Sequence, residues 1–157
     1  MRYGTSARFA MSLAFLLAAG SSSLQAQEAL TFEQAEAAMD AAEAEARAND
    51  WNLTILIADA DGVPVYLRRM DGAPVRTHEI ATRKVITVLG SGMASGAYGQ
   101  ALQAGQVEEV PNGVTFEGGY PIRVDGEIVG AMSASGATGA QDAQVVRAGL
   151  AAIGLQP

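Results

Sequence analysis

Apolar residues form two short runs, at positions 120–124 and 128–134, on either side of an Asp125-Gly126 pair. Asp-Gly supplies the two positive-φ residues of a type I′ turn, so this pattern predicts a β-hairpin over residues 118–136. The second run is apolar at both alternating sets of positions, which is typical of a strand covered on both faces. Pro121 cannot donate to a neighbouring strand, so we expect it at the first position of its strand or on an edge strand.

Three further patterns precede the hairpin. Thr31 and Gln34 have the spacing of a capping box, and a run of good helix formers with a narrow stripe of small apolar residues follows to about residue 48. Apolar runs at 53–58 and 63–67 flank a turn and predict two strands. Residues 77–89 then predict a second helix, with Thr77 as its N-cap.

Residues 90–105 lose this periodicity. Five glycines interrupt them, which favours a flap or a loop closing over something: Gly90, Gly92, Gly96, Gly99 and Gly105. The C-terminal pattern predicts a last helix over 141–153, entered by a Gly/Ser/Thr loop at 135–140. Such a loop has two interpretations, a close turn between strand and helix or a set of N–H groups that favour an anion. The element order predicts an α+β fold, an antiparallel sheet with helices packed on it.

The first 26 residues have the pattern of a secretory signal peptide. Arg2 and Arg8 precede an apolar core that is too short to span a membrane, and a small polar region ends at Ala26. We therefore expect a single mature domain, 27–157, in the periplasm or secreted, with no membrane insertion after cleavage. Cleavage removes two arginines and no acid, so the formal net charge goes from −7 to −9. Such an acidic domain is a poor candidate for binding nucleic acid.

Few residues could carry chemistry. The sequence has no cysteine and a single histidine, which excludes disulfides, thiolate sites and an ordinary zinc site. It also has no Gly-x-Ser-x-Gly motif for a serine nucleophile, so the sequence leaves open whether the protein is an enzyme. His78 is the first candidate to bind a metal. The alternative is that His78 is a solvated residue in the first turn of its helix.

An ordered set of motifs resembles the GlcG/HbpS-like haem-binding family, which is related to the C-terminal domain of PduO-type corrinoid adenosyltransferases. The resemblance covers about residues 30–153. Its main motifs are Asp59-x-x-Gly62, Arg69-Met70-Asp71-Gly72-Ala73, Lys84, Gly118-Gly119-x-Pro121-Ile122, Gly130-x-x-x-x-Ser135-Gly136 and Asp142…Ala148-Gly149. The resemblance implies a profilin-like sandwich, with an antiparallel sheet of about five strands and flanking helices, assembled into homo-oligomers. One departure is Ser133, where the family prefers glycine.

The same resemblance implies binding of haem or a related tetrapyrrole, with oxidative degradation as a possible activity. On this interpretation His78 binds the iron between the second helix and the hairpin, and Arg69 and Lys84 pair with the propionates. Tyr120, Gly118 and Gly119 complete the predicted haem site. Other candidate iron ligands are Tyr98, Met70, Met93 and Met132. The rival hypotheses are a module that binds a small organic acid at the 135–140 loop, an accessory protein of a periplasmic oxidation pathway and a purely structural oligomer.

Overall fold

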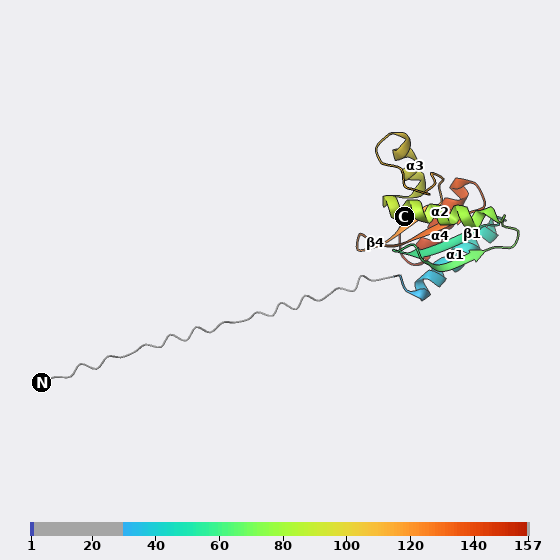
Figure 1. Ribbon diagram of the computed structural model, residues 1–157. Coiled ribbons are helices and arrows are strands. Elements are labelled where there is room, and N and C mark those ends of the chain that lie inside the picture. The colour runs from blue at the N-terminus through green and yellow to red at the C-terminus, as the bar shows by residue number, and fades with distance from the viewer. Residues whose placement is uncertain (2–29, 157) are drawn as a thin grey trace.

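The computed structural model describes Met1 and residues 30–156, so the predicted signal peptide lies outside the described residues except for Met1. The described elements are α1 (Phe32–Ala48), β1 (Thr54–Asp59), β2 (Pro64–Arg69), α2 (Arg76–Ser91), α3 (Ser95–Gln103), β3 (Gly119–Val124), β4 (Glu127–Ser135) and α4 (Gly139–Ala152). Helices α1 and α4 cover one face of the sheet and α2 covers the other, while α3 projects beyond α2 (Figure 1). Among the described helices, none is both long and apolar enough to cross a bilayer.

The sheet confirms the predicted hairpin. Its strand order is β2-β1-β4-β3, every pair is antiparallel, and β4 runs through the centre. Asp125 and Gly126 both have positive φ, at 50° and 88°, as the turn chemistry requires. Pro121 lies in the edge strand β3, where its missing N–H breaks no ladder. The α+β class is confirmed, with four strands in the described part of the chain where about five were expected.

Helix α1 shows how its predicted stripe of small residues is used. The capping box is formed, because Thr31 Oγ1 accepts from Gln34 N at 3.2 Å and Gln34 Oε1 accepts from Thr31 N at 2.9 Å. The stripe is buried against α4 and the sheet. Gly149 of α4 lies at the contact, where a Cβ would stand 2.7 Å from the Ala38 carbonyl oxygen and 2.6 Å from Met132 Cε. Small side chains on both helices therefore allow this close packing.

Two helix starts differ from the sequence prediction. Helix α2 begins at Arg76, and Thr77 is inside it instead of capping it. The Thr77 hydroxyl donates to the Pro74 carbonyl at 2.6 Å and lies 2.7 Å from the Thr54 hydroxyl, so it fastens α2 to β1. Helix α4 begins two residues earlier than predicted, because Thr138 and Gln141 form a second capping box.

The prediction of an irregular flap over residues 90–105 is wrong, since this stretch contains α3. Two of its glycines are close-packing positions. A Cβ at Gly96 would lie 2.5 Å from Glu117 Cγ, and one at Gly99 would lie 2.7 Å from the Thr115 carbonyl oxygen. Glycine there lets the helix lie against the segment that leads into β3, and the packing contacts outweigh the low helix propensity of glycine.

Tyr98 holds the segment between α3 and β3 in place. Its ring is 1% exposed, and its hydroxyl accepts from Val110 N at 2.8 Å and reaches the Glu108 carbonyl oxygen at 3.4 Å. Tyr98→Phe should lower the free energy of unfolding by about 1–3 kcal/mol, because it leaves a backbone N–H without its partner. Hydrogen exchange should be faster at Val110. Tyr66→Phe is the matched control, because the Tyr66 hydroxyl accepts from the Arg68 side chain and holds no backbone N–H. Unchanged exchange at Val110 would contradict this role.

Candidate functional site

A buried ion pair lies where α2, β4 and α4 meet. Lys84, the only lysine in the sequence, is 1% exposed, and its Nζ donates to Asp142 Oδ2 at 2.8 Å and to the Ala134 carbonyl oxygen at 2.7 Å. Asp142 is 3% exposed, and its Oδ1 accepts from the Ala137 N–H at 3.1 Å. One cation from α2 is thereby tied both to the last helix and to the end of the central strand.

Burial dominates the electrostatics of this pair. Loss of hydration lowers the pKa of Lys84, against the opposing charge of Asp142. Loss of hydration also raises the pKa of Asp142, although Lys84 and the backbone N–H groups act the other way. Both directions favour the uncharged forms of the two groups. The ion pair is therefore costly to hold in its charged form.

Gly118 and Gly119 make room for the ion pair. A Cβ at Gly118 would lie 2.5 Å from Asp142 Cβ and 2.9 Å from Lys84 Nζ, and the residue has a φ of +101°. A Cβ at Gly119 would lie 3.0 Å from Lys84 Cβ and 3.0 Å from Ser95 Oγ. The family resemblance placed these two glycines in the predicted haem site. In the structure the groups they approach belong to the protein itself.

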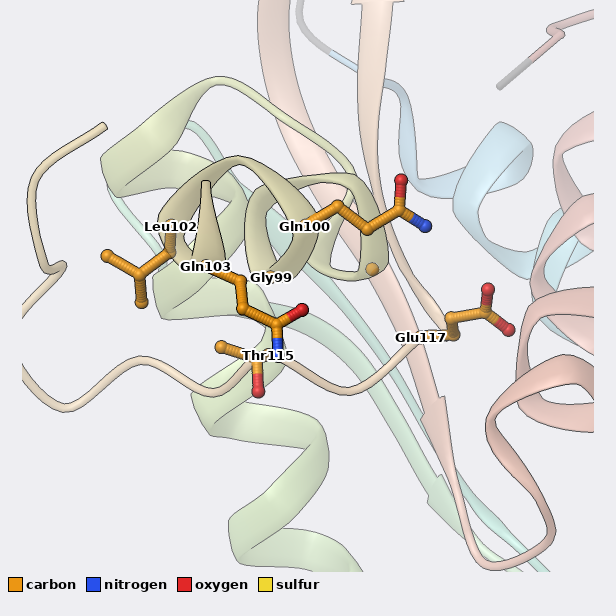
Figure 2. Close-up of a pocket in the computed structure, with 7 residues that line it drawn as sticks. Gly99, Gln100, Leu102, Gln103, Thr115 and Glu117 are labelled. Carbon is orange, nitrogen blue, oxygen red and sulfur yellow. The ribbon is translucent and has the colours of Figure 1, made fainter. Parts of the chain in front are cut away.

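A cavity of about 290 Å³ opens beside the ion pair, which forms part of its wall. Ile80 and Phe116 supply apolar wall, and Glu117 supplies a carboxylate. A second cavity, of about 430 Å³, lies between α3 and residues 115–117. Figure 2 shows the Gln103 side chain turned toward Thr115 there, while Glu117 lies on the side of α4. Glu117 lines both cavities and lies between them.

The 135–140 loop has little left to offer an anion. Asp142 accepts from the Ala137 N–H, and Gln141 Oε1 accepts from the Thr138 N–H at 3.0 Å. The Thr138 hydroxyl in turn accepts from Gln141 N at 3.4 Å. Because side chains of α4 already occupy these donors, the structure favours the interpretation of this loop as a close turn between strand and helix.

The structure places His78 and Arg69 near the N-terminal end of α2. His78 is exposed in the first turn of α2, and Arg69 ends β2, where it pairs with Thr54 in the ladder. Thr54 hydrogen-bonds Thr77, the residue before His78, so Arg69 and His78 belong to the same end of α2. The Arg69 guanidinium donates to the Ala73 carbonyl oxygen at 3.1 and 2.6 Å.

His78 does not face the cavity. It is two positions before Ile80, which lines the cavity, and this spacing separates the two side chains by about 200° around the helix axis. Among the described residues, no cluster of three or more histidines and acids could hold a metal ion. His78 therefore stays a candidate iron ligand at the surface.

Tyr120 lies on the other face of the sheet. It packs against the core beneath α1 and α4, opposite Met132, and its hydroxyl accepts from Arg147 Nη1 at 2.9 Å. The sheet thus separates Tyr120 from Lys84. Tyr98, Met70 and Met132, three of the other candidate ligands, are buried as packing residues, and Met93 is partly buried.

The family motifs included Lys84, Gly118, Gly119 and Asp142, but the predicted haem site left Asp142 out. Apart from its place in a motif, Asp142 gave no local signal of a site, since an acid in the first turn of a helix is an ordinary capping residue. The cationic residues offer one indirect signal that position 84 is functional, because the chain has nine arginines and only one lysine. An isolated lysine among so many arginines suggests that position 84 requires an amine or a slim side chain.

The fold and the site together define a single-sheet α+β domain with a buried ion pair beside a small cavity. The chain belongs to the HbpS-like family, whose model, described as haem degrading protein HbpS-like, matches residues 30–151. Protein GlcG of Escherichia coli strain K12 is 35% identical over 109 residues, which cover 68% of this chain and 81% of GlcG. These matches confirm the family that the motifs predicted.

Two solved structures extend the comparison. A double mutant of HbpS from Streptomyces reticuli has a TM-score of 0.74 and 28% identity, and the match covers 89% of this chain and 97% of that chain. The PduOC:heme complex also has a TM-score of 0.74, with 27% identity over 79% of this chain and 94% of that chain. Both similarities agree with the predicted fold and with the relation to the PduO C-terminal domain.

Proposed function

We propose that this protein binds haem or a related tetrapyrrole. The observation that carries the proposal is membership of the HbpS-like family, strengthened by the likeness to the heme complex of PduOC over nearly all of that chain. Haem would supply iron redox chemistry when bound, so we extend the proposal to oxidative breakdown of the bound haem, in line with the family description. The loss of haem absorbance in the presence of ascorbate and oxygen tests this extension.

The end of α2 that carries His78 has the groups that haem needs. His78 offers an imidazole and Arg69 offers a guanidinium for a propionate, and both residues are exposed. Apolar surface is present as well, since Val75 at the start of α2 is 78% exposed and Leu67, on the same face of β2 as Arg69, is 39% exposed. The cavity beside Lys84 is small for a macrocycle, because its volume of about 290 Å³ is at the lower end of the range for ligand pockets.

Lys84 is buried and does not belong to this exposed surface. Its predicted contact with a propionate would require the ion pair with Asp142 to open, because Asp142 already neutralises the buried amine. We therefore assign propionate pairing to Arg69. Iron coordination is assigned to His78, the only imidazole in the sequence.

Hemin titration tests this function. The protein should give a saturable shift of the Soret band at micromolar concentration, and His78→Ala should shift or abolish that spectrum. Glu79→Ala is the matched control, because Glu79 is exposed on the next position of the same helix and is expected to leave the spectrum unchanged. Absence of a saturable shift in the unmodified protein would overturn the proposal. An unchanged spectrum for His78→Ala would reject His78 as the ligand.

We further propose that the protein is exported and works as a homo-oligomer. The first 26 residues support export, and the exposed side chains of Phe32 and Val63, away from the proposed haem surface, leave apolar surface for a second copy to cover. Cell fractionation with mass spectrometry of the mature N-terminus tests export and the cleavage site after Ala26. Light scattering tests assembly, and a monomer at all concentrations would contradict it.

A further inference from the structure

We propose that Lys84 is a nucleophilic amine that forms an imine with a small uncharged aldehyde or ketone held in the cavity beside it. This goes beyond haem binding and uses a different part of the molecule. The proposal rests on three features: the identity of Lys84 as the single lysine, its pairing with Asp142, and the cavity that both residues line.

The first feature is the choice of lysine. Nine arginines serve every other cationic position of the chain. An arginine stays protonated under all ordinary conditions, whereas a buried lysine readily becomes a neutral amine. A cation with a purely structural role can stay charged at all times, so arginine would serve there. A nucleophile, by contrast, requires a free electron pair on nitrogen.

The second feature is a proton acceptor, Asp142, within hydrogen-bond distance of the amine. Lys84 Nζ is 2.8 Å from Asp142 Oδ2, so a proton can pass directly between the two groups. Nζ makes two hydrogen bonds in the structure, to Asp142 and to the Ala134 carbonyl, although an ammonium has three hydrogens to donate. Burial lowers the pKa of Lys84 and raises that of Asp142, so it narrows the difference in pKa that this proton transfer must overcome.

The third feature defines the ligand. The cavity of about 290 Å³ suits a molecule of a few heavy atoms, and Ile80, Phe116 and Ala137 give it apolar wall. Glu117 adds a carboxylate to the same cavity, so a ligand that carries its own carboxylate would be repelled. The chemistry therefore selects an apolar aldehyde or ketone over a keto acid.

Asp142 takes one proton from the Lys84 ammonium, and the neutral amine attacks the carbonyl carbon to form a C–N bond. A proton moves from nitrogen to the former carbonyl oxygen, which gives a carbinolamine. Asp142 then returns its proton to the hydroxyl, the C–O bond breaks, and water leaves. The product is a protonated imine on Lys84 beside an ionised Asp142, with no oxidant or reductant consumed.

Reductive trapping tests the imine. The purified protein is incubated with butanal and cyanoborohydride, and the alkylated residue is located by peptide mass mapping. Lys84 and the α-amino group are the only primary amines, so each site is read separately. We expect butylation of Lys84 in the folded protein, saturable with butanal concentration. Labelling of Lys84 only after denaturation, or labelling without saturation, would overturn the proposal.

Two variant comparisons place the reaction in the cavity. Ile80→Trp should fill the cavity and reduce labelling of Lys84 severalfold, while Ile86→Trp, on an exposed part of the same helix, should leave it unchanged.

If the first variant fails to fold, charge selectivity gives an independent test. Succinic semialdehyde should label Lys84 poorly, and Glu117→Gln should increase that labelling severalfold. Equal labelling by both aldehydes in both proteins would overturn the proposal. None of these readouts depends on hemin, so a failed hemin titration would be a separate result.

Discussion

Replacing Lys84 by methionine is expected to lower the free energy of unfolding by about 3–5 kcal/mol, because Asp142 would be left in the interior without its counter-charge. The reverse change, Asp142→Leu, should cost a similar amount, since it strands the ammonium. Both side chains are nearly inaccessible, and Lys84 Nζ lies 2.8 Å from Asp142 Oδ2. The combination of Lys84→Met with Asp142→Leu should recover most of the loss, because it removes both buried charges at once.

Urea denaturation of the four proteins, arranged as a double-mutant cycle, gives the coupling between the two positions. Glu79→Gln serves as the control for an exposed pair, since Glu79 and Arg83 are 4.0 Å apart at the surface of α2. That substitution should change the stability by less than about 1 kcal/mol. Additive losses from the two buried substitutions would show that the ion pair is not coupled in the folded protein.

Gly118→Ala is expected to destabilise the protein by about 2–5 kcal/mol, which combines backbone strain with overpacking. The added Cβ would enter a left-handed residue and stand 2.5 Å from Asp142 Cβ and 2.9 Å from Lys84 Nζ. Gly126→Ala is the matched control, because Gly126 also has a positive φ, of +88°, but has no atom within 4 Å of the added Cβ. The control should cost only about 1–2 kcal/mol, the strain contribution alone.

Thermal and urea denaturation of the two alanine variants measure this difference. The variant at position 118 should also be labelled more slowly in the butanal experiment if the added methyl group disturbs the ion pair. Equal destabilisation by the two substitutions would mean that the backbone at Gly118 relaxes to accept a side chain, and that close packing is not the reason for glycine at this position.

Local signals explain the elements that the sequence predicted well. The hairpin depends on Asp125-Gly126, whose preference for positive φ acts within four residues. Helix α1 depends on a capping box of three-residue span and on small side chains at helical spacing. Such features are set by neighbouring residues, so they can be recognised before any tertiary contact is known.

Glycine in α3 shows where local reasoning fails. Glycine is typical of flexible loops, yet Gly96 and Gly99 lie in a helix. Thr115 and Glu117 pack against them there. A glycine that provides flexibility and a glycine that permits close contact are identical in the sequence. The surroundings alone distinguish them, and here the surroundings come from residues about 20 positions further along the chain.

The predicted site residues were separated for a similar reason. The sequence grouped His78, Lys84 and Tyr120, but it does not state which face of each element points where. In the fold, His78 and Ile80 point to different sides of α2, and Tyr120 lies across the sheet from Lys84. Family motifs indicate which positions are specific to the family, while the side on which each residue lies depends on how the helices pack.

The amino-acid sequence was sufficient for the class of fold, the family, the hairpin and the first helix, because these depend on spacing and turn chemistry along the chain. The partner of Lys84 depends on the tertiary structure. Asp142 is 58 residues further along, and the two meet only because α2 and α4 converge at the end of β4, where Gly118 leaves room for both. Packing also created the cavity beside them, and with it the burial that lowers the pKa of Lys84 and raises that of Asp142.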